Sequence, residues 1–137
     1  GMSAGAWGYA KVCLDEAIAY ARERHTFGKP LIANQVVRHR LVDMAMRINA
    51  VQSTLELLAY RVGQGEKPVA EICMLKNLAT STMEYCANEA MQIFGGAGYL
   101  RGAKVERIYR DARAFRIGEG TSEMQRMTIA RQLLKGE

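Results

Sequence analysis

The chain has 137 residues, of which nearly half are apolar and about a quarter are charged. This length suits a single domain with a sizeable core, and the composition argues against an intrinsically disordered protein. The net charge is +5, and residues 101–116 alone carry six basic and two acidic side chains. This stretch suits either an anionic partner or a helix face with internal salt bridges.

The cysteines and histidines of the chain do not form a metal-binding pattern. Cys13, Cys73 and Cys86 lie far apart within apolar helical stretches, without a framework of paired cysteines. We therefore expect no metal site and a reducing compartment. Because no apolar run approaches the roughly 18 residues that a transmembrane helix needs, we also expect no membrane span.

Residues 4–25 have the pattern of an amphipathic helix. Trp7, Leu14 and Ala21 recur on one face together with small apolar residues, and most charges fall elsewhere. The H-T-F-G-K-P run that follows contains a glycine and a proline, which predict that the helix ends there.

The longest predicted helix covers residues 35–63, with Asn34 as its N-cap. Its apolar residues alternate in steps of four and three, which is typical of a helix bundle or a coiled coil. This seam consists of Val37, Leu41, Met44, Ile48, Val51, Leu55, Leu58 and Val62. We favour packing inside this chain over a dimer contact, because other apolar helices are available.

Three further helices are predicted, at residues 69–94, 103–114 and 122–135. The first has an apolar stripe that Lys76 interrupts. The stripe consists of Val69, Ile72, Ala79, Met83, Cys86, Ala90 and Ile93. Strand-length alternation of polar and apolar residues is absent from the sequence. The predicted fold is all-α, an antiparallel bundle of three long helices and two short ones that forms one domain over residues 1–137.

A glycine-rich turn at residues 95–98 follows one of these helices. A dinucleotide-binding glycine motif needs a preceding strand, and here an arginine stands where that motif needs its last glycine. The turn therefore suits either a tight helix-to-helix connection or the close approach of a ligand.

Glu119 is the strongest candidate for a reactive group. It stands between Gly118 and Gly120, and Ser122 with Gln125 fits a helix capping box just beyond it. Such a carboxylate could simply favour the helix dipole, or it could act as a base toward an acidic proton in a closed apolar site.

Residues 24–28 are a third candidate site. An arginine, a hydroxyl group and an aromatic ring could together hold a phosphorylated ligand. An arginine at a helix C-terminus is also a favourable cation without any ligand.

Four motifs in this order and spacing make the whole chain resemble one family. They are R-H-T-F-G-K-P at 24–30, Q-I-F-G-G-A-G-Y at 92–99, V-E-R-I-Y-R-D-A-R at 105–113 and E-G-T-S-E-M-Q-R at 119–126. The chain resembles the C-terminal helical domain of the acyl-CoA dehydrogenases. The N-terminal helical domain and the middle β-domain of that family are absent from this sequence.

The resemblance implies an FAD-dependent enzyme that removes a proton from Cα of an acyl-CoA thioester while a hydride leaves Cβ for the flavin. It implies that Glu119 is the catalytic base and that Gly120 contacts the substrate. Seven residues are expected to bind FAD, in a site that is shared across a dimer interface. They are Arg24, Thr26, Phe27, Gln35, Gln92, Gly96 and Thr121.

The resemblance also implies partners and a location. We expect a homo-oligomer, either a dimer or a tetramer, with an acyl-CoA substrate and electron-transfer flavoprotein as partners of the complete enzyme. We expect a cytoplasmic location in a bacterium, or the mitochondrial matrix in a eukaryote. In this light, the basic stretch at 101–116 is expected to be mainly structural.

Two alternatives remain open. In the family, the other domains supply much of the flavin and acyl pockets, so we expect this chain alone to be inactive. The alternative to a part of an enzyme is a non-catalytic helical assembly module. Nucleic-acid binding is not expected, because basic residues at every third position wind around a helix rather than form one stripe.

Overall fold

The computed structural model describes residues 1–118 and 120–135. The elements in chain order are α1 (Met2–Glu23), β1 (His25–Thr26), β2 (Lys29–Pro30), a 3-10 turn η1 (Leu31–Ala33), α2 (Gln35–Gly63), α3 (Val69–Phe94), α4 (Gly96–Tyr99), α5 (Lys104–Ile117) and α6 (Ser122–Leu133). The predicted all-α bundle is confirmed, and each predicted helix is present with its ends shifted by at most a few residues.

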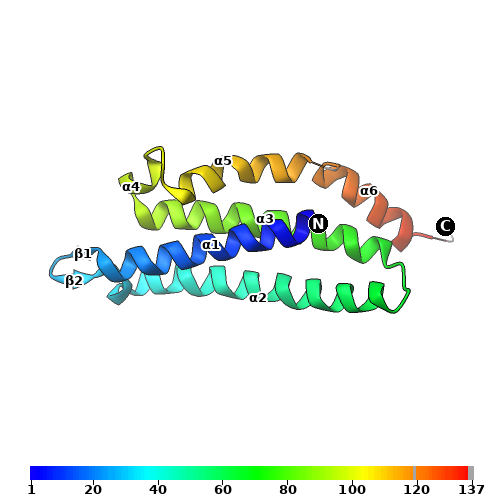
Figure 1. Ribbon diagram of the computed structural model, residues 1–137, viewed down its shortest axis with the longest axis horizontal. Coiled ribbons are helices and arrows are strands. Elements are labelled where there is room, and N and C mark those ends of the chain that lie inside the picture. Colours follow the sequence, from blue (N-terminus) through cyan, green and yellow to red (C-terminus); the bar gives the residue numbers. More distant parts are fainter. Residues whose placement is uncertain (119, 136–137) are drawn as a thin grey trace.

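The long helices lie side by side along the long axis of the molecule, and successive ones run in opposite directions (Figure 1). α6 continues from the end of α5 at an angle to it. α1 and α3 therefore run parallel, and they form the most extensive contact in the molecule. Small side chains line this contact, including Ala10, Cys13 and Ala17 on α1 and Cys86 and Ala90 on α3, and small residues let helices approach closely.

Most of the predicted seam of α2 packs inside the chain, as favoured from the sequence, but Val62 at its end is 50% exposed. Leu41, Met44, Ile48, Val51 and Leu58 are buried, and α2 contacts both α1 and α3. Asn34 is the N-cap as predicted, because its Oδ1 accepts a hydrogen bond from the backbone N–H of Val36 at 2.8 Å.

The first turn of α3 departs from the prediction. Val69 and Ile72 belong to the predicted stripe, yet they are exposed, whereas Lys76 is buried. The burial of Lys76 has a local cause, because its ammonium group donates a hydrogen bond to the carbonyl oxygen of Gly120.

The hairpin after α1 is a feature that the sequence analysis missed. β1 and β2 pair antiparallel, with His25 opposite Pro30 and Thr26 opposite Lys29. Phe27 and Gly28 form the turn, and both have positive φ, which two-residue type I′ turns require. Strands of two residues are too short to show a period-2 pattern in the sequence.

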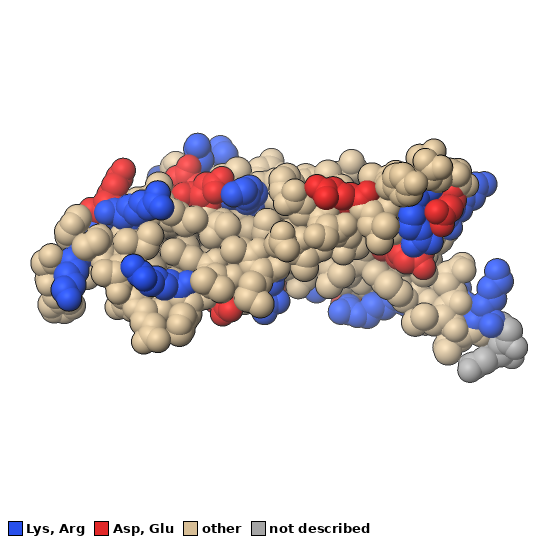
Figure 2. Space-filling model, turned by 90° about the horizontal axis from the view of Figure 1, so that it is seen from below, with Lys and Arg blue, Asp and Glu red and all other residues tan. Residues whose placement is uncertain are grey.

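Charges of both signs are interspersed on the face shown in Figure 2. The basic stretch at 101–116 forms salt bridges, which is one of the two alternatives expected from the sequence. Within the described chain, four of its six basic residues form ion pairs. These pairs are Lys104 with Glu16, Arg110 with Glu106, and both Arg113 and Arg116 with Glu84.

Candidate functional site

The junction between α5 and α6 carries the strongest sequence candidate. Glu119 itself lies outside the described residues, whereas Gly118 and Gly120 on either side of it are described. Gly120 has φ of 101°, a conformation that favours glycine. Thr121 is the N-cap of α6, since its Oγ1 accepts a hydrogen bond from the backbone N–H of Met124 at 3.1 Å.

The predicted capping box at Ser122 is therefore wrong by one residue. Ser122 is buried, and its Oγ accepts a hydrogen bond from Arg116 Nε at 3.2 Å instead of capping the helix. A threonine and a serine in sequence can both cap a helix. The arginine at the end of α5 decides between them, and that contact exists only in the folded chain.

α3 holds this junction through two consecutive side chains. Lys76 Nζ donates a hydrogen bond to the carbonyl oxygen of Gly120, and Asn77 Nδ2 donates one to the carbonyl oxygen of Ser122 at 3.3 Å. Lys76 is only 7% exposed. The sequence analysis recorded this lysine merely as a break in an apolar stripe and did not assign it to a site.

A cavity of about 610 Å³ lies beside the junction. Its walls come from the first turn of α1, the second half of α2 and the first half of α3, and they are mostly apolar. Lys76 and Gln125 add polar groups to this lining. Among the apolar residues that line it are Met2, Leu55, Leu58, Val62, Ile72 and Leu75.

A second group of predicted residues gathers at the other end of the bundle, where α1 and α3 both end (Figure 1). Arg24, Thr26 and Gln35 are exposed there, as is the turn residue Phe27. The side chain of Phe27 is fully exposed although its φ is +53°, which L residues rarely adopt. An exposed aromatic ring on a strained turn is available to a ligand or to another chain.

Gln92 and Gly96 lie at the same end, on the last turn of α3 and the start of α4. Gln92 is exposed and lines a cavity of about 360 Å³ with Tyr99 and Tyr109. A Cβ added at Gly96 would meet no atom within 4 Å, so its backbone is open to a close approach. The rings of Tyr20 and Phe94 stack at a centroid distance of 4.3 Å and tie the ends of α1 and α3 together.

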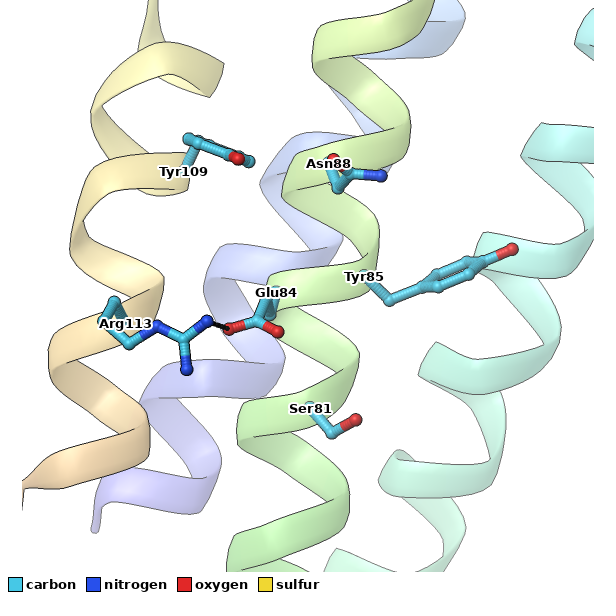
Figure 3. A pocket seen from close by; sticks show the side chains of 6 residues that line it. All are labelled: Ser81, Glu84, Tyr85, Asn88, Tyr109 and Arg113. Carbon is cyan, nitrogen blue, oxygen red and sulfur yellow. Dashed lines mark ion pairs between the residues drawn. The ribbon is translucent and has the colours of Figure 1, made fainter. Parts of the chain in front are cut away.

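A polar pocket of about 400 Å³ lies between α3 and α5 (Figure 3). The sequence analysis did not identify it. Glu84 faces Arg113 across this pocket at 3.3 Å, and its other oxygen accepts a hydrogen bond from Arg116 Nη1 at 3.3 Å. Two guanidinium groups therefore already compensate the carboxylate, and through Arg116 the pocket connects to Ser122 at the junction.

The thiols of the core are poorly suited to chemistry. Burial raises the pKa of Cys13 to about 12, with a smaller contribution from the neighbouring Cys86. Burial likewise raises the pKa of Cys86 to about 12, although Arg47 acts in the opposite direction. Since the thiolate is the reactive form, both cysteines are inert near neutral pH.

Among residues 1–118 and 120–135, no cluster of three or more His, Cys, Asp or Glu side chains could hold a metal ion. In the same part of the chain, no helix is both long enough and apolar enough to cross a bilayer.

The predicted site residues thus fall into two groups in different parts of the bundle. Gly120 and Thr121 lie with Lys76 at the α5–α6 junction, and Arg24, Thr26, Phe27, Gln35, Gln92 and Gly96 lie where α1 and α3 end (Figure 1). The fold brings the members of each group together, and it does not bring the two groups to each other.

Comparisons with known proteins identify the family of the chain. The sequence model for "Acyl-CoA dehydrogenase, C-terminal domain" matches residues 1–134. The chain is 41% identical to 3-(aryl)acrylate reductase from Clostridium sporogenes over 98% of its own length and 36% of that protein. It is 39% identical to acyl-CoA dehydrogenase from Bacillus subtilis, covering 99% of this chain and 36% of that one.

Solved structures give the same result. Butyryl-CoA dehydrogenase from Megasphaera elsdenii superposes with a TM-score of 0.95 at 36% identity, over 98% of this chain and 35% of that one. The FAD complex of PigA superposes with a TM-score of 0.90 at 30% identity, over 96% and 34%. The chain therefore spans about a third of the length of the relatives it matches, and it belongs to the acyl-CoA dehydrogenase family as a C-terminal helical domain.

Proposed function

We propose that this chain is the part of an FAD-dependent acyl-CoA dehydrogenase that supplies the catalytic base. Glu119 takes the proton from Cα of an acyl-CoA thioester, and Gly120 contacts the substrate. Bound FAD would accept the hydride that leaves Cβ. The observation that carries the proposal is the α5–α6 junction: the segment next to Glu119 in sequence is held on α3 beside a large apolar cavity.

The chemistry of this junction suits a base. Apolar walls beside a carboxylate favour its neutral form and so raise its basicity toward an acidic proton. The cavity of about 610 Å³ has the size of a small-molecule site and is lined mainly by apolar side chains. The glycines at 118 and 120 leave the carboxylate without bulky neighbours in the chain.

FAD fits the second group of residues in chemical character. Arg24 offers a guanidinium group to a pyrophosphate, Phe27 offers an exposed ring, and Gln92 offers an amide. Gly96 allows a close backbone approach. We propose that these residues, with Thr26 and Gln35, hold the FAD in the active site of a second copy of the chain. Thr121 instead contacts the FAD in the active site of its own subunit.

This division supports a homo-oligomer, a dimer or a tetramer, because the two groups lie on different parts of the bundle, at the α5–α6 junction and where α1 and α3 end (Figure 1). We extend the proposal to electron-transfer flavoprotein as the redox partner of the complete enzyme. We also propose a cytoplasmic location, since the relatives named above are bacterial.

The direction of the reaction is a second question. The relatives include a protein named acyl-CoA dehydrogenase and one named 3-(aryl)acrylate reductase, at similar identity. Proton transfer at Cα is reversible, so the same glutamate could return a proton during reduction. We propose oxidation of a saturated acyl-CoA, with reduction of an unsaturated one as the alternative.

A non-catalytic assembly module is the competing function. The outer face of α2 favours it, because Val42, Met46 and Leu57 are each more than half exposed. This function would make Glu119 dispensable, whereas the enzyme function would not.

The decisive experiment gives the chain the domains that its relatives have. The 137 residues replace the matching C-terminal part of Megasphaera elsdenii butyryl-CoA dehydrogenase, and flavin bleaching near 450 nm is followed after addition of butyryl-CoA. We expect bleaching with the unmutated chain and a loss of about 10²- to 10⁴-fold with Glu119→Gln. Asp15→Asn, an exposed carboxylate on α1, is the matched control and should keep the rate.

Activity that survives Glu119→Gln would contradict the proposal. A yellow, folded hybrid without bleaching would favour the assembly module. For the chain alone, size exclusion with light scattering and an absorbance scan should show a folded, colourless oligomer. A flavin spectrum that acyl-CoA bleaches would overturn the expectation that the isolated chain is inactive.

A further inference from the structure

We infer that Lys76 is a positioning residue: its ammonium group fixes the carbonyl of Gly120 and so holds residues 120–121 on α3. The anchor rests on observed contacts, and its catalytic consequence rests on the proposed function of Glu119. No comparison above assigns a role to this lysine.

The burial of Lys76 needs an explanation. Its side chain lies in the first half of α3 at 7% exposure, at a position where the apolar stripe of the helix would place a hydrophobic residue. Burying an ammonium group costs free energy unless polar groups compensate it. Within the described residues, no carboxylate forms an ion pair with Lys76, and the Gly120 carbonyl accepts its hydrogen bond.

This bond acts at a place where the chain would otherwise be free to move. Gly120 has φ of 101°, and a glycine peptide can rotate more easily than any other. A charge-assisted hydrogen bond is roughly twice as strong as a neutral one, so it sets the orientation of the Gly120–Thr121 peptide plane. That plane follows directly after the residue proposed as the base.

Neighbouring contacts attach the segment at a second residue, Ser122, in addition to Gly120. Asn77, the next residue on α3, donates to the Ser122 carbonyl at 3.3 Å, and Arg116 at the end of α5 donates to Ser122 Oγ at 3.2 Å. These two contacts dock the start of α6. Lys76 reaches back to the Gly120 carbonyl and also lines the apolar cavity, so it connects the proposed base segment to the proposed substrate space.

The anchor can be measured in the 137-residue chain itself. Gly120–Thr121 is the only Gly–Thr pair in the sequence, so labelling glycine with ¹³C′ and threonine with ¹⁵N leaves one HNCO signal, from the Gly120 carbonyl. We expect Lys76→Met to shift this ¹³C′ signal and to speed hydrogen exchange of the Thr121 amide. Lys11→Met, which removes an exposed lysine on α1, should change neither.

The unmutated chain provides a test that does not depend on a variant folding. A buried, bonded ammonium group should give a slowly exchanging ¹⁵Nζ signal with a coupling across the hydrogen bond to Gly120 ¹³C′. A Gly120 signal unchanged by Lys76→Met in a folded variant, or the absence of this coupling, would overturn the anchor.

Kinetics of the hybrid enzyme separate positioning from stability. We expect Lys76→Met to lower kcat by about 10- to 100-fold with little change in KM, because misplacement of a catalytic group slows the chemical step more than binding. An unchanged kcat would overturn the catalytic role of Lys76. If the unmutated hybrid is inactive, the proposed function fails with this consequence, and the NMR measurement still decides the anchor.

Discussion

Gly96 and Gly98 differ in the space around them, although both lie in the four-residue helix α4. A Cβ at Gly98 would stand 2.7 Å from Phe94 Cβ and 3.3 Å from the carbonyl oxygen of Met91. Neither atom can move without shifting the end of α3. A Cβ at Gly96 would meet open space. The sequence alone shows two similar glycines in one turn. The structure shows that Gly98 is needed for packing, whereas Gly96 has space for a ligand.

We therefore predict opposite outcomes for two alanine substitutions. Gly98→Ala should lower the free energy of unfolding by about 1–3 kcal/mol, because overpacking forces the backbone to shift. Gly96→Ala should change it by less than about 0.5 kcal/mol. Urea unfolding of the isolated chain measures both values, and equal losses for the two variants would contradict the packing difference.

The helix α2 shows how one element can serve two environments. Met44 is fully buried against the rest of the bundle, whereas Met46, two residues later, is 65% exposed. The same residue type on the same helix thus provides a matched comparison of the two faces. The inner face builds the core, and the outer face is available to a second copy of the chain.

Met44→Ala should destabilise the chain by about 2–5 kcal/mol, since it removes a buried side chain and leaves a cavity. Met46→Ala should cost less than about 0.5 kcal/mol in the monomer. Thermal unfolding followed by circular dichroism compares the two at low protein concentration. A large loss for Met46→Ala that grows with protein concentration would show instead that this face stabilises an oligomer.

The molecule as a whole depends on the close contact of α1 with α3, and Cys13 and Cys86 report on it. Their pKa values are raised from an ordinary 9.0 to about 12, mainly by burial. Above pH 9 the unfolded chain loses thiol protons that the folded chain retains. The folded state then binds more protons, so its stability falls as the pH rises.

We predict that each thiol lowers the free energy of unfolding by about 1.4 kcal/mol per pH unit between pH 9 and about 12. Its contribution is fully present below pH 9. Denaturant unfolding at several pH values should therefore give a steeper loss for the natural chain than for the Cys13→Ala, Cys86→Ala double variant. Identical slopes would mean that the core admits solvent to these thiols.

The helices were predictable because each one carries its own local signal. The seam of α2 and its cap at Asn34 are signals within one helix, and so are the small residues of α3. A 3.6-residue period is visible in each helix without knowledge of the partner helix. The motifs around Arg24, Gln92 and Glu119 also supported the family assignment, which the comparisons confirmed.

Contacts between distant segments could not be predicted in this way. Lys76 and Gly120 are 44 residues apart, and Glu84 meets Arg116 from a distance of 32 residues along the chain. The hydrophobic pattern shows that Lys76 interrupts an apolar face, but the free energy of a buried ammonium group depends on which polar atom lies within reach. That atom is provided by the packing of α5 and α6 on α3, and periodicity within one helix carries no information about it.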